Sequence, residues 1–140
     1  MGIFSKLKEL FEKKPTETLH ELEEKIKQLQ KKTNSKSIAV VGIGGRLKGL
    51  PLVYSTEDED SLKNFSARLI ELIKDLTKFA EERQVKEFTV HYLDSILFFK
   101  VIIENIGFLS HTQFESDIEV VKQWIMRNLS NLKEIFEEKV

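Results

Sequence analysis

Residues 37–55, SIAVVGIGGRLKGLPLVYS, decide the fold of this chain. Two short runs of mostly branched apolar residues, Ile38 to Ile43 and Leu50 to Tyr54, stand on either side of a segment rich in glycine. Glycine accepts the positive φ angles that a reversing loop requires, so the stretch predicts a β-hairpin. Pro51 lacks a backbone N–H and therefore suits the start of a strand at the edge of a sheet.

The same glycines could mark a phosphate-binding loop, but the known patterns do not fit. A P-loop has two glycines separated by four residues and then Lys and Ser or Thr, whereas Gly44 and Gly49 are followed by Leu50 and Pro51. A dinucleotide-binding loop needs a third glycine where this chain has Leu47, and a helix that opens at the glycines. The hairpin is the better interpretation.

Hydrophobic periodicity predicts helices on both sides of the hairpin. A first helix is expected from Thr18 to Lys32, a long one after the hairpin and a last one near the C-terminus. Three pairs of residues have the spacing of a capping box and predict where these helices begin: Thr18 and Glu21, Thr56 and Glu59, and Ser116 and Glu119.

Each of these helices carries an apolar stripe, which means that one face of each must be covered by other structure. In the first helix the stripe consists of Leu19, Leu22, Ile26 and Leu29. In the long helix the stripe consists of Leu62, Phe65, Leu69, Leu72, Leu76 and Phe79. In the last helix it consists of Ile118, Val121, Ile125, Leu129, Leu132 and Phe136.

Between these two helices the period changes to two, which indicates strands. Three apolar residues alternate with polar ones in residues 87–92 and predict a strand with one buried face: Phe88, Val90 and Tyr92. Residues 96–103, apolar almost throughout, and residues 106–110 are expected to complete a three-stranded meander.

Composition narrows the classes of function. A chain of 140 residues, 41% of them hydrophobic, has the size of one domain, and its 22 Lys and Arg nearly balance 23 Asp and Glu, so no global positive charge favours nucleic acid. There is no cysteine, and His20, His91 and His111 lack the spacing of a metal site. We therefore expect no catalytic residue, no cofactor and no metal ion, and interpret the acids of residues 57–60 as the start of a helix.

The hairpin segment, with Gly49, Leu50 and Pro51 leading its second strand, resembles the first hairpin of roadblock/LC7 domains, where a Gly-Ile-Pro or Gly-Leu-Pro step recurs. The order of elements from about residue 18 to residue 140 is similar to the α-β-β-α-β-β-β-α order of that family. The resemblance implies an α+β fold with α/β/α layers and a five-stranded antiparallel sheet. We expect residues 15–140 to form this domain, and residues 1–14 to be an amphipathic N-terminal extension.

The resemblance also implies a function. Members of the family are non-enzymatic scaffolds or adaptors that pair as homodimers or heterodimers and bind and regulate small Ras-like GTPases or recruit them to larger assemblies. They pair by joining sheet edges and packing their long helices, so we expect this chain to pair with itself or with a paralogous subunit. The candidate interface residues are Glu87, Thr89 and His91 on the edge strand, and Arg68 and Leu72 on the long helix.

The N-terminal extension carries a second candidate surface. Five apolar residues fall on one side of a helix, opposite several lysines: Ile3, Phe4, Leu7, Leu10 and Phe11. Such a helix could lie on an anionic membrane or pack on a partner. Because no signal peptide is visible, we expect a cytoplasmic protein, or one peripheral to the inner membrane surface.

Other classes of function stay open. Longin-like trafficking adaptors have a related core that begins at the hairpin, and the helix expected at residues 18–32 favours a roadblock domain over them. A peripheral membrane adaptor would use the N-terminal helix. A small-ligand sensor or an unrecognised enzyme would need a set of convergent polar residues, which the sequence does not display.

Overall fold

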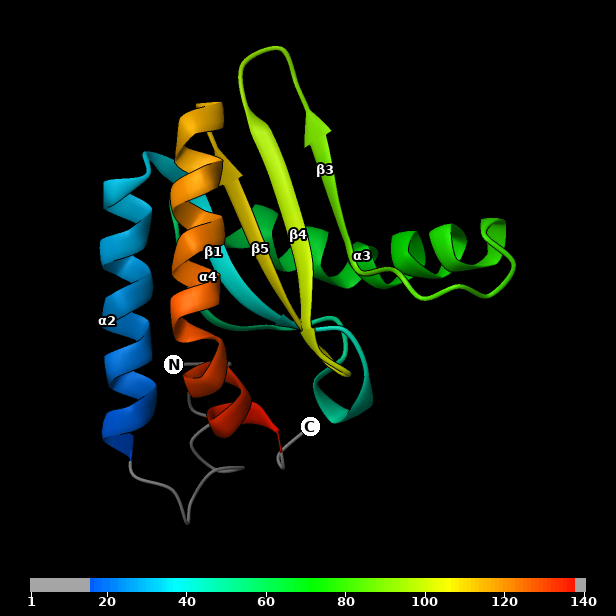
Figure 1. Ribbon diagram of the computed structural model, residues 1–140, viewed down its shortest axis with the longest axis horizontal. Helices are drawn as coiled ribbons and strands as arrows, with labels where there is room; N and C mark the ends of the chain where they lie inside the picture. The colour runs from blue at the N-terminus through cyan, green and yellow to red at the C-terminus, as the bar shows by residue number, and fades with distance from the viewer. Residues whose placement is uncertain (1–15, 138–140) are drawn as a thin grey trace.

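The computed structural model describes residues 16–137, which form a five-stranded antiparallel sheet with helices on both faces (Figure 1). In chain order the elements are α2 (Thr16–Lys32), β1 (Ser35–Gly42), β2 (Pro51–Thr56), α3 (Glu59–Phe79), β3 (Glu87–His91), β4 (Ile96–Ile103), β5 (Ile106–Thr112) and α4 (Glu115–Phe136). This is the order of elements that the sequence predicts.

The strands lie in the order β2-β1-β5-β4-β3, so β2 and β3 are the two edges of the sheet. The predicted hairpin is confirmed, because β1 and β2 pair antiparallel, with Ile38 opposite Ser55 and Val40 opposite Val53. The prediction that Pro51 begins an edge strand is confirmed as well.

The loop of the hairpin holds a short 3-10 helix, Gly45–Leu47. Gly45 and Gly49 have φ angles of 67° and 83°, in the left-handed region that glycine adopts without steric cost. Gly42 is needed for space: a Cβ atom there would lie 2.0 Å from the carbonyl oxygen of Leu47. Its N–H donates to the carbonyl of Leu50 and its carbonyl accepts from the N–H of Gly49, each at 2.8 Å, and these two bonds close the loop.

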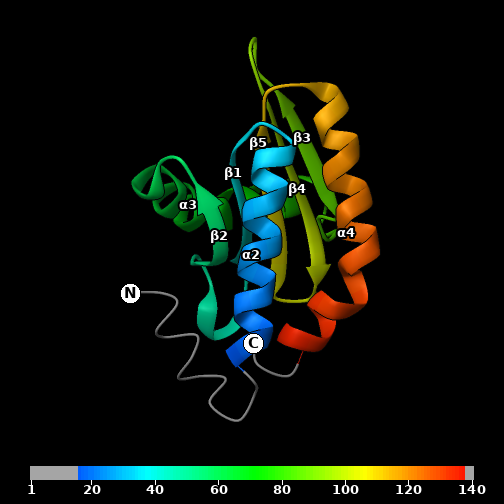
Figure 2. The ribbon, with the colours of Figure 1, turned by 90° about the vertical axis from the view of Figure 1, so that its left-hand side faces the viewer.

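The two faces of the sheet carry separate cores. Helices α2 and α4 cover one face and α3 covers part of the other (Figure 2). The first core buries Leu22, Ile26, Ile38, Val40, Phe98, Phe108, Val121 and Ile125, among others. The second and smaller core buries Ala39, Val41, Leu62, Leu69, Leu97, Phe99 and Leu109. Neighbouring residues of one strand divide between the two cores because successive side chains point to opposite faces.

The predicted starts of the helices need correction. Helix α2 begins at Thr16, and α4 begins at Glu115 without a side-chain hydrogen bond at its N-cap, Phe114. In α3 the N-cap is Asp58 rather than Thr56, because the Thr56 hydroxyl accepts the N–H of Asp58 in a tight turn and the Asp58 carboxylate then meets the first helical turn. Strand β5 runs to Thr112, two residues past the prediction, since β1 and β4 both pair with it to that point.

Candidate interaction surface

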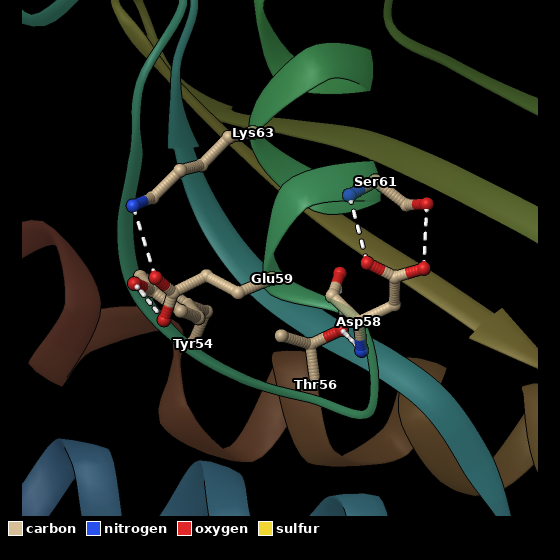
Figure 3. A network of polar contacts seen from close by, with 6 residues as sticks. All are labelled: Tyr54, Thr56, Asp58, Glu59, Ser61 and Lys63. Atoms are coloured by element: carbon tan, nitrogen blue, oxygen red, sulfur yellow. Dashed lines mark hydrogen bonds and ion pairs between the residues drawn. The ribbon is translucent and has the colours of Figure 1, made fainter.

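Asp58 fixes the first turn of α3 (Figure 3). Its carboxylate accepts hydrogen bonds from the N–H of Ser61 at 3.0 Å and from the Ser61 hydroxyl at 2.8 Å. These bonds favour the ionised carboxylate, so they hold the pKa of Asp58 below its usual value. The negative charge also lies at the positive end of the helix dipole.

Glu59 ties the same turn to the edge strand β2 (Figure 3). It accepts a hydrogen bond from the Tyr54 hydroxyl at 3.0 Å and lies 2.9 Å from the ammonium group of Lys63. The Lys63 contact, and next the Tyr54 bond, lower the pKa of Glu59, whereas burial and then Glu59 raise the pKa of Tyr54. The start of α3 is therefore held beside β2, and the helix runs from there across the strands.

The second half of α3 is exposed. Leu62 and Leu69 are buried against the sheet, but Leu72, Leu76 and Phe79 of the same stripe are 36%, 38% and 90% exposed. Figure 1 shows the C-terminal end of α3 extending beyond β3. The predicted stripe exists, but the described chain covers only its first half, because the sheet ends before the helix does.

The exposed end of α3 is a well-formed terminus. The N–H of Glu82 donates to the carbonyl of Thr77 at 2.9 Å and the N–H of Glu81 to that of Lys78 at 3.1 Å, while Glu81 has a φ angle of 57°. These are the two bonds and the left-handed residue of a Schellman motif. Phe79 is consequently held in a closed helical turn.

Strand β3 adds apolar side chains on the same face of the sheet as α3. Phe88 stacks on Phe99 of the second core, with ring centroids 5.2 Å apart, so Val90 and Tyr92 share that face. Val90 and Tyr92 are 37% and 51% exposed, and Leu93 in the following turn is fully exposed. The predicted buried face of this strand is therefore wrong in its second half for the single chain.

We define the α3–β3 surface as Leu72, Leu76, Phe79, Val90, Tyr92 and Leu93. Sequence reasoning included only Leu72 of this set among the interface residues, because it treated the apolar positions of the helix and strand as core. The length of the predicted helix could have identified Leu76 and Phe79, because an amphipathic helix of that length is longer than a five-stranded sheet is wide.

The structure divides the predicted interface residues between two faces. Glu87, Thr89 and His91 are exposed on β3 and lie opposite Lys100, Phe98 and Ile96 of β4, which places them on the α4 side of the sheet. Glu87 forms an ion pair with Lys100 at 3.3 Å.

Arg68 is exposed on α3, and Leu72 belongs to the α3 stripe on the opposite side of the sheet. All five predicted residues are thus accessible, and the edge of β3 separates the two groups. Their role as an interface stays a prediction.

Beside the first half of α3 lies a cavity of about 240 Å³. Its apolar wall consists of Leu62, Phe65, Tyr92, Leu97 and Leu109, and its rim consists of Lys36, Ser37, Asp58, Ser61 and His111. The predicted sites did not include it.

His111 stands at the rim of this cavity. Its Nε2 atom lies 2.8 Å from the Ser95 hydroxyl, and its ring meets the Tyr92 ring at 5.9 Å. Burial, followed by the charge of Lys36, lowers the pKa of His111. The ring therefore favours the neutral form in which it accepts or donates one hydrogen bond at each nitrogen.

The hairpin motif keeps a structural role in the fold. Gly49 supplies the positive φ angle, Leu50 packs against the first core, and Pro51 is buried at the start of β2. The candidate surface of the N-terminal extension, Ile3, Phe4, Leu7, Leu10 and Phe11, lies outside the described residues.

Within residues 16–137, no group of three or more His, Asp or Glu side chains is placed to hold a metal ion. In the same range, none of the helices combines the length and the apolar character needed to cross a membrane.

Comparison with known proteins places the chain by structure. No protein-family model matches it, and no curated protein matches it in sequence. Among solved structures, the gliding protein MglB from Thermus thermophilus matches with a TM-score of 0.65 at 14% identity, over 87% of this chain and 90% of that one. MglB from Myxococcus xanthus matches with a TM-score of 0.64 at 14% identity, over 81% and 85% of the two chains.

A third MglB structure, with a tetrameric arrangement, matches with a TM-score of 0.63 at 11% identity, over 100% of this chain and 94% of that one. At such identities the similarity is one of fold. Together with the observed order of helices and strands, it confirms what the hairpin motif implied, and we conclude that this chain has a roadblock/LC7-like fold.

Proposed function

We propose that the protein is a non-enzymatic scaffold that works as a dimer and binds and regulates a small Ras-like GTPase, or recruits it to a larger assembly. The observation that carries this proposal is the α3–β3 surface. It presents a free strand edge and the apolar end of a long helix on the same side of the molecule, and the fold is that of roadblock/LC7 domains, the family whose resemblance implies such a scaffold.

The outer edge of β3 is available to a partner. Strand β3 pairs with β4 on one side, and no other strand within residues 16–137 pairs with its outer side. An edge with unpaired N–H and carbonyl groups beside apolar side chains is a template for another strand. When two β3 strands pair about a two-fold axis, each edge provides hydrogen-bond partners for the other. Such a contact ends at two copies, because both copies use the same surface.

The second copy is this same chain or a paralogous subunit with the same fold. Solved MglB has been described in a tetrameric arrangement, which supports self-association as a property of proteins with this fold.

The GTPase is a proposal from the resemblance of the hairpin and the element order to roadblock/LC7 domains, and the structural similarity to MglB supports the fold on which that resemblance depends. Arg46 lies in the exposed hairpin loop, and Arg127 donates a hydrogen bond to the side chain of Gln123 at 3.2 Å. We propose that the protein acts on the GTPase by ordering its switch regions, with no inserted arginine.

Analytical ultracentrifugation across a range of protein concentrations tests the dimer. Val90→Lys places one positive charge from each copy beside the paired edges, where the two charges repel each other. We expect it to raise the dissociation constant of the dimer by roughly tenfold or more. The matched control is Met126→Lys on α4, at a position 76% exposed and remote from the α3–β3 surface, which should leave the association unchanged. A strictly monomeric protein at tens of micromolar would contradict the proposal.

Affinity capture tests the GTPase. The immobilised protein is incubated with lysate of the source organism in GDP or in a non-hydrolysable GTP analogue, and captured proteins are identified by mass spectrometry. We expect a small Ras-like GTPase enriched in one nucleotide state and lost with the Val90→Lys variant. Recovery of no such GTPase in either state would count against this function.

We further propose a cytoplasmic location, with attachment to the inner membrane surface through residues 1–14 as the alternative. Flotation with anionic liposomes, using the full chain and a chain without residues 1–14, separates the two. Equal binding by both proteins would rule out a membrane role for residues 1–14.

A further inference from the structure

The cavity beside α3 and the exposed end of α3 lie on the same side of the sheet. The cavity is lined by Leu62, Phe65, Tyr92, Leu97 and Leu109. The exposed end carries Leu76 and Phe79, and Phe79 is 90% exposed although its turn is closed by a Schellman motif. One copy of the chain thus presents both an apolar hollow and an apolar projection.

The length of α3 explains the projection. Its 21 residues span roughly 31 Å at 1.5 Å per residue. Five strands spaced ~4.8 Å apart are about 19 Å wide from edge to edge. Because α3 begins beside β2 and crosses the strands (Figure 1), its last turns continue past β3 by roughly 12 Å.

This overhang fits a second copy. In the dimer that we propose above, the sheet continues across the joined β3 edges, so roughly 12 Å of overhang covers about two strands of the other copy. Those strands are β3 and β4 of the second copy. Leu97 on β4 and Tyr92, the residue that follows β3, both line the cavity of that copy. The two-fold axis repeats the contact, so both projections and both cavities are used.

We propose that Phe79 of one copy seats at the mouth of the cavity of a second copy, against Tyr92 and Leu97. This inference rests on the dimer described under the proposed function and deepens it: α3 exchanges its apolar end between the copies. The cavity is then a receptor for an aromatic side chain of the second copy. His111 at its rim becomes more deeply buried on association.

Crosslinking tests the contact directly, because the chain contains no cysteine and introduced thiols are the only ones present. A Phe79→Cys protein is mixed with a Tyr92→Cys protein that carries an additional tag, and the mixture is treated with a short bis-maleimide. Both positions are at least half exposed, so both variants should fold, which thermal melts verify. We expect a crosslinked species with the mass of one tagged and one untagged chain.

The matched control replaces Tyr92→Cys with Met126→Cys on α4, an exposed position on the opposite layer, and should give no such species. A second measurement uses the dissociation constant. Phe79→Ala removes two rings per dimer and should weaken the dimer between about 10²- and 10⁴-fold. Phe79→Leu should retain most of the affinity.

The outcomes separate this inference from the dimer itself. If the protein dimerises through β3, but the two cysteine variants do not crosslink and Phe79→Ala leaves the dissociation constant unchanged, the Phe79 contact is refuted and the dimeric scaffold stands. If the unmodified protein is monomeric at every concentration, both fail.

Discussion

The glycines of the hairpin loop provide a graded test of the fold, because the structure assigns each a different role. In Gly42→Ala the new Cβ atom would lie 2.0 Å from the backbone oxygen of Leu47, which cannot move without opening the loop. In Gly49→Ala the nearest atom is 3.6 Å away, and the difficulty is the φ angle of 83°. In Gly44→Ala the contact is 2.3 Å, but with the end of the Asn105 side chain, which can rotate away.

These geometries set the expected losses in the free energy of unfolding. Overpacking against fixed backbone, with weakening of the hydrogen bonds of Gly42 to Leu50 and Gly49, should cost about 3 kcal/mol or more. A left-handed alanine at Gly49 should cost about 1–2 kcal/mol. A rotamer change of Asn105 in Gly44→Ala should cost about 1 kcal/mol or less.

Urea unfolding followed by circular dichroism at 222 nm measures all three variants. The protein concentration must be the same throughout, because association stabilises the folded chain. As an internal check, Gly44→Ala should cost almost nothing in a protein that already carries Asn105→Ala. If Gly42→Ala is no more destabilising than Gly44→Ala, the argument that Gly42 is required for space is wrong.

Three further predictions concern the core, the cavity rim and the start of α3. Gly107→Ala would place a Cβ atom 2.4 Å from the buried Phe99 ring and should destabilise the protein by about 1–3 kcal/mol in urea unfolding, and by clearly less in a Phe99→Leu background. Folding lowers the pKa of His111 from its ordinary 6.5, so the unfolded chain binds the proton more readily than the folded chain. The stability of the folded chain should therefore fall as the pH drops below 6.5. Between pH 7.5 and pH 5.5 the melting temperature should fall less in His111→Gln than in the unmodified protein. The pKa of Asp58 in the folded protein is lowered from 3.8, so its stabilising effect should be lost as the pH falls below 3.8 and through the lower pKa of the folded protein. Asp58→Ala should lower the melting temperature at pH 7 and Asp58→Asn should lower it less, whereas equal melting temperatures for all three proteins would contradict the N-cap assignment.

Much of the fold can be predicted from sequence because its signals are local. The glycine-rich turn before Pro51, the period of 3.6 in the helices and the period of two in residues 87–92 each depend on residues close together in the chain. They predicted the order of elements, the edge position of β2 and most of the buried stripe of α4. The N-cap of α3 was missed because Thr56 and Asp58 are both good capping residues, and the turn geometry selects between them.

The amino-acid sequence by itself determined that α3 and β3 each have an apolar face that something must cover. Only the tertiary structure decided which part the chain covers with its own sheet: Leu62 and Leu69 are buried, while Leu76, Phe79 and Val90 are left exposed. The physical reason is one of dimensions, because a helix of 21 residues that crosses five strands is longer than the sheet is wide. The periodicity of the sequence identifies the apolar face of each element, and the width of the sheet decides whether that face is buried by the same chain or by another.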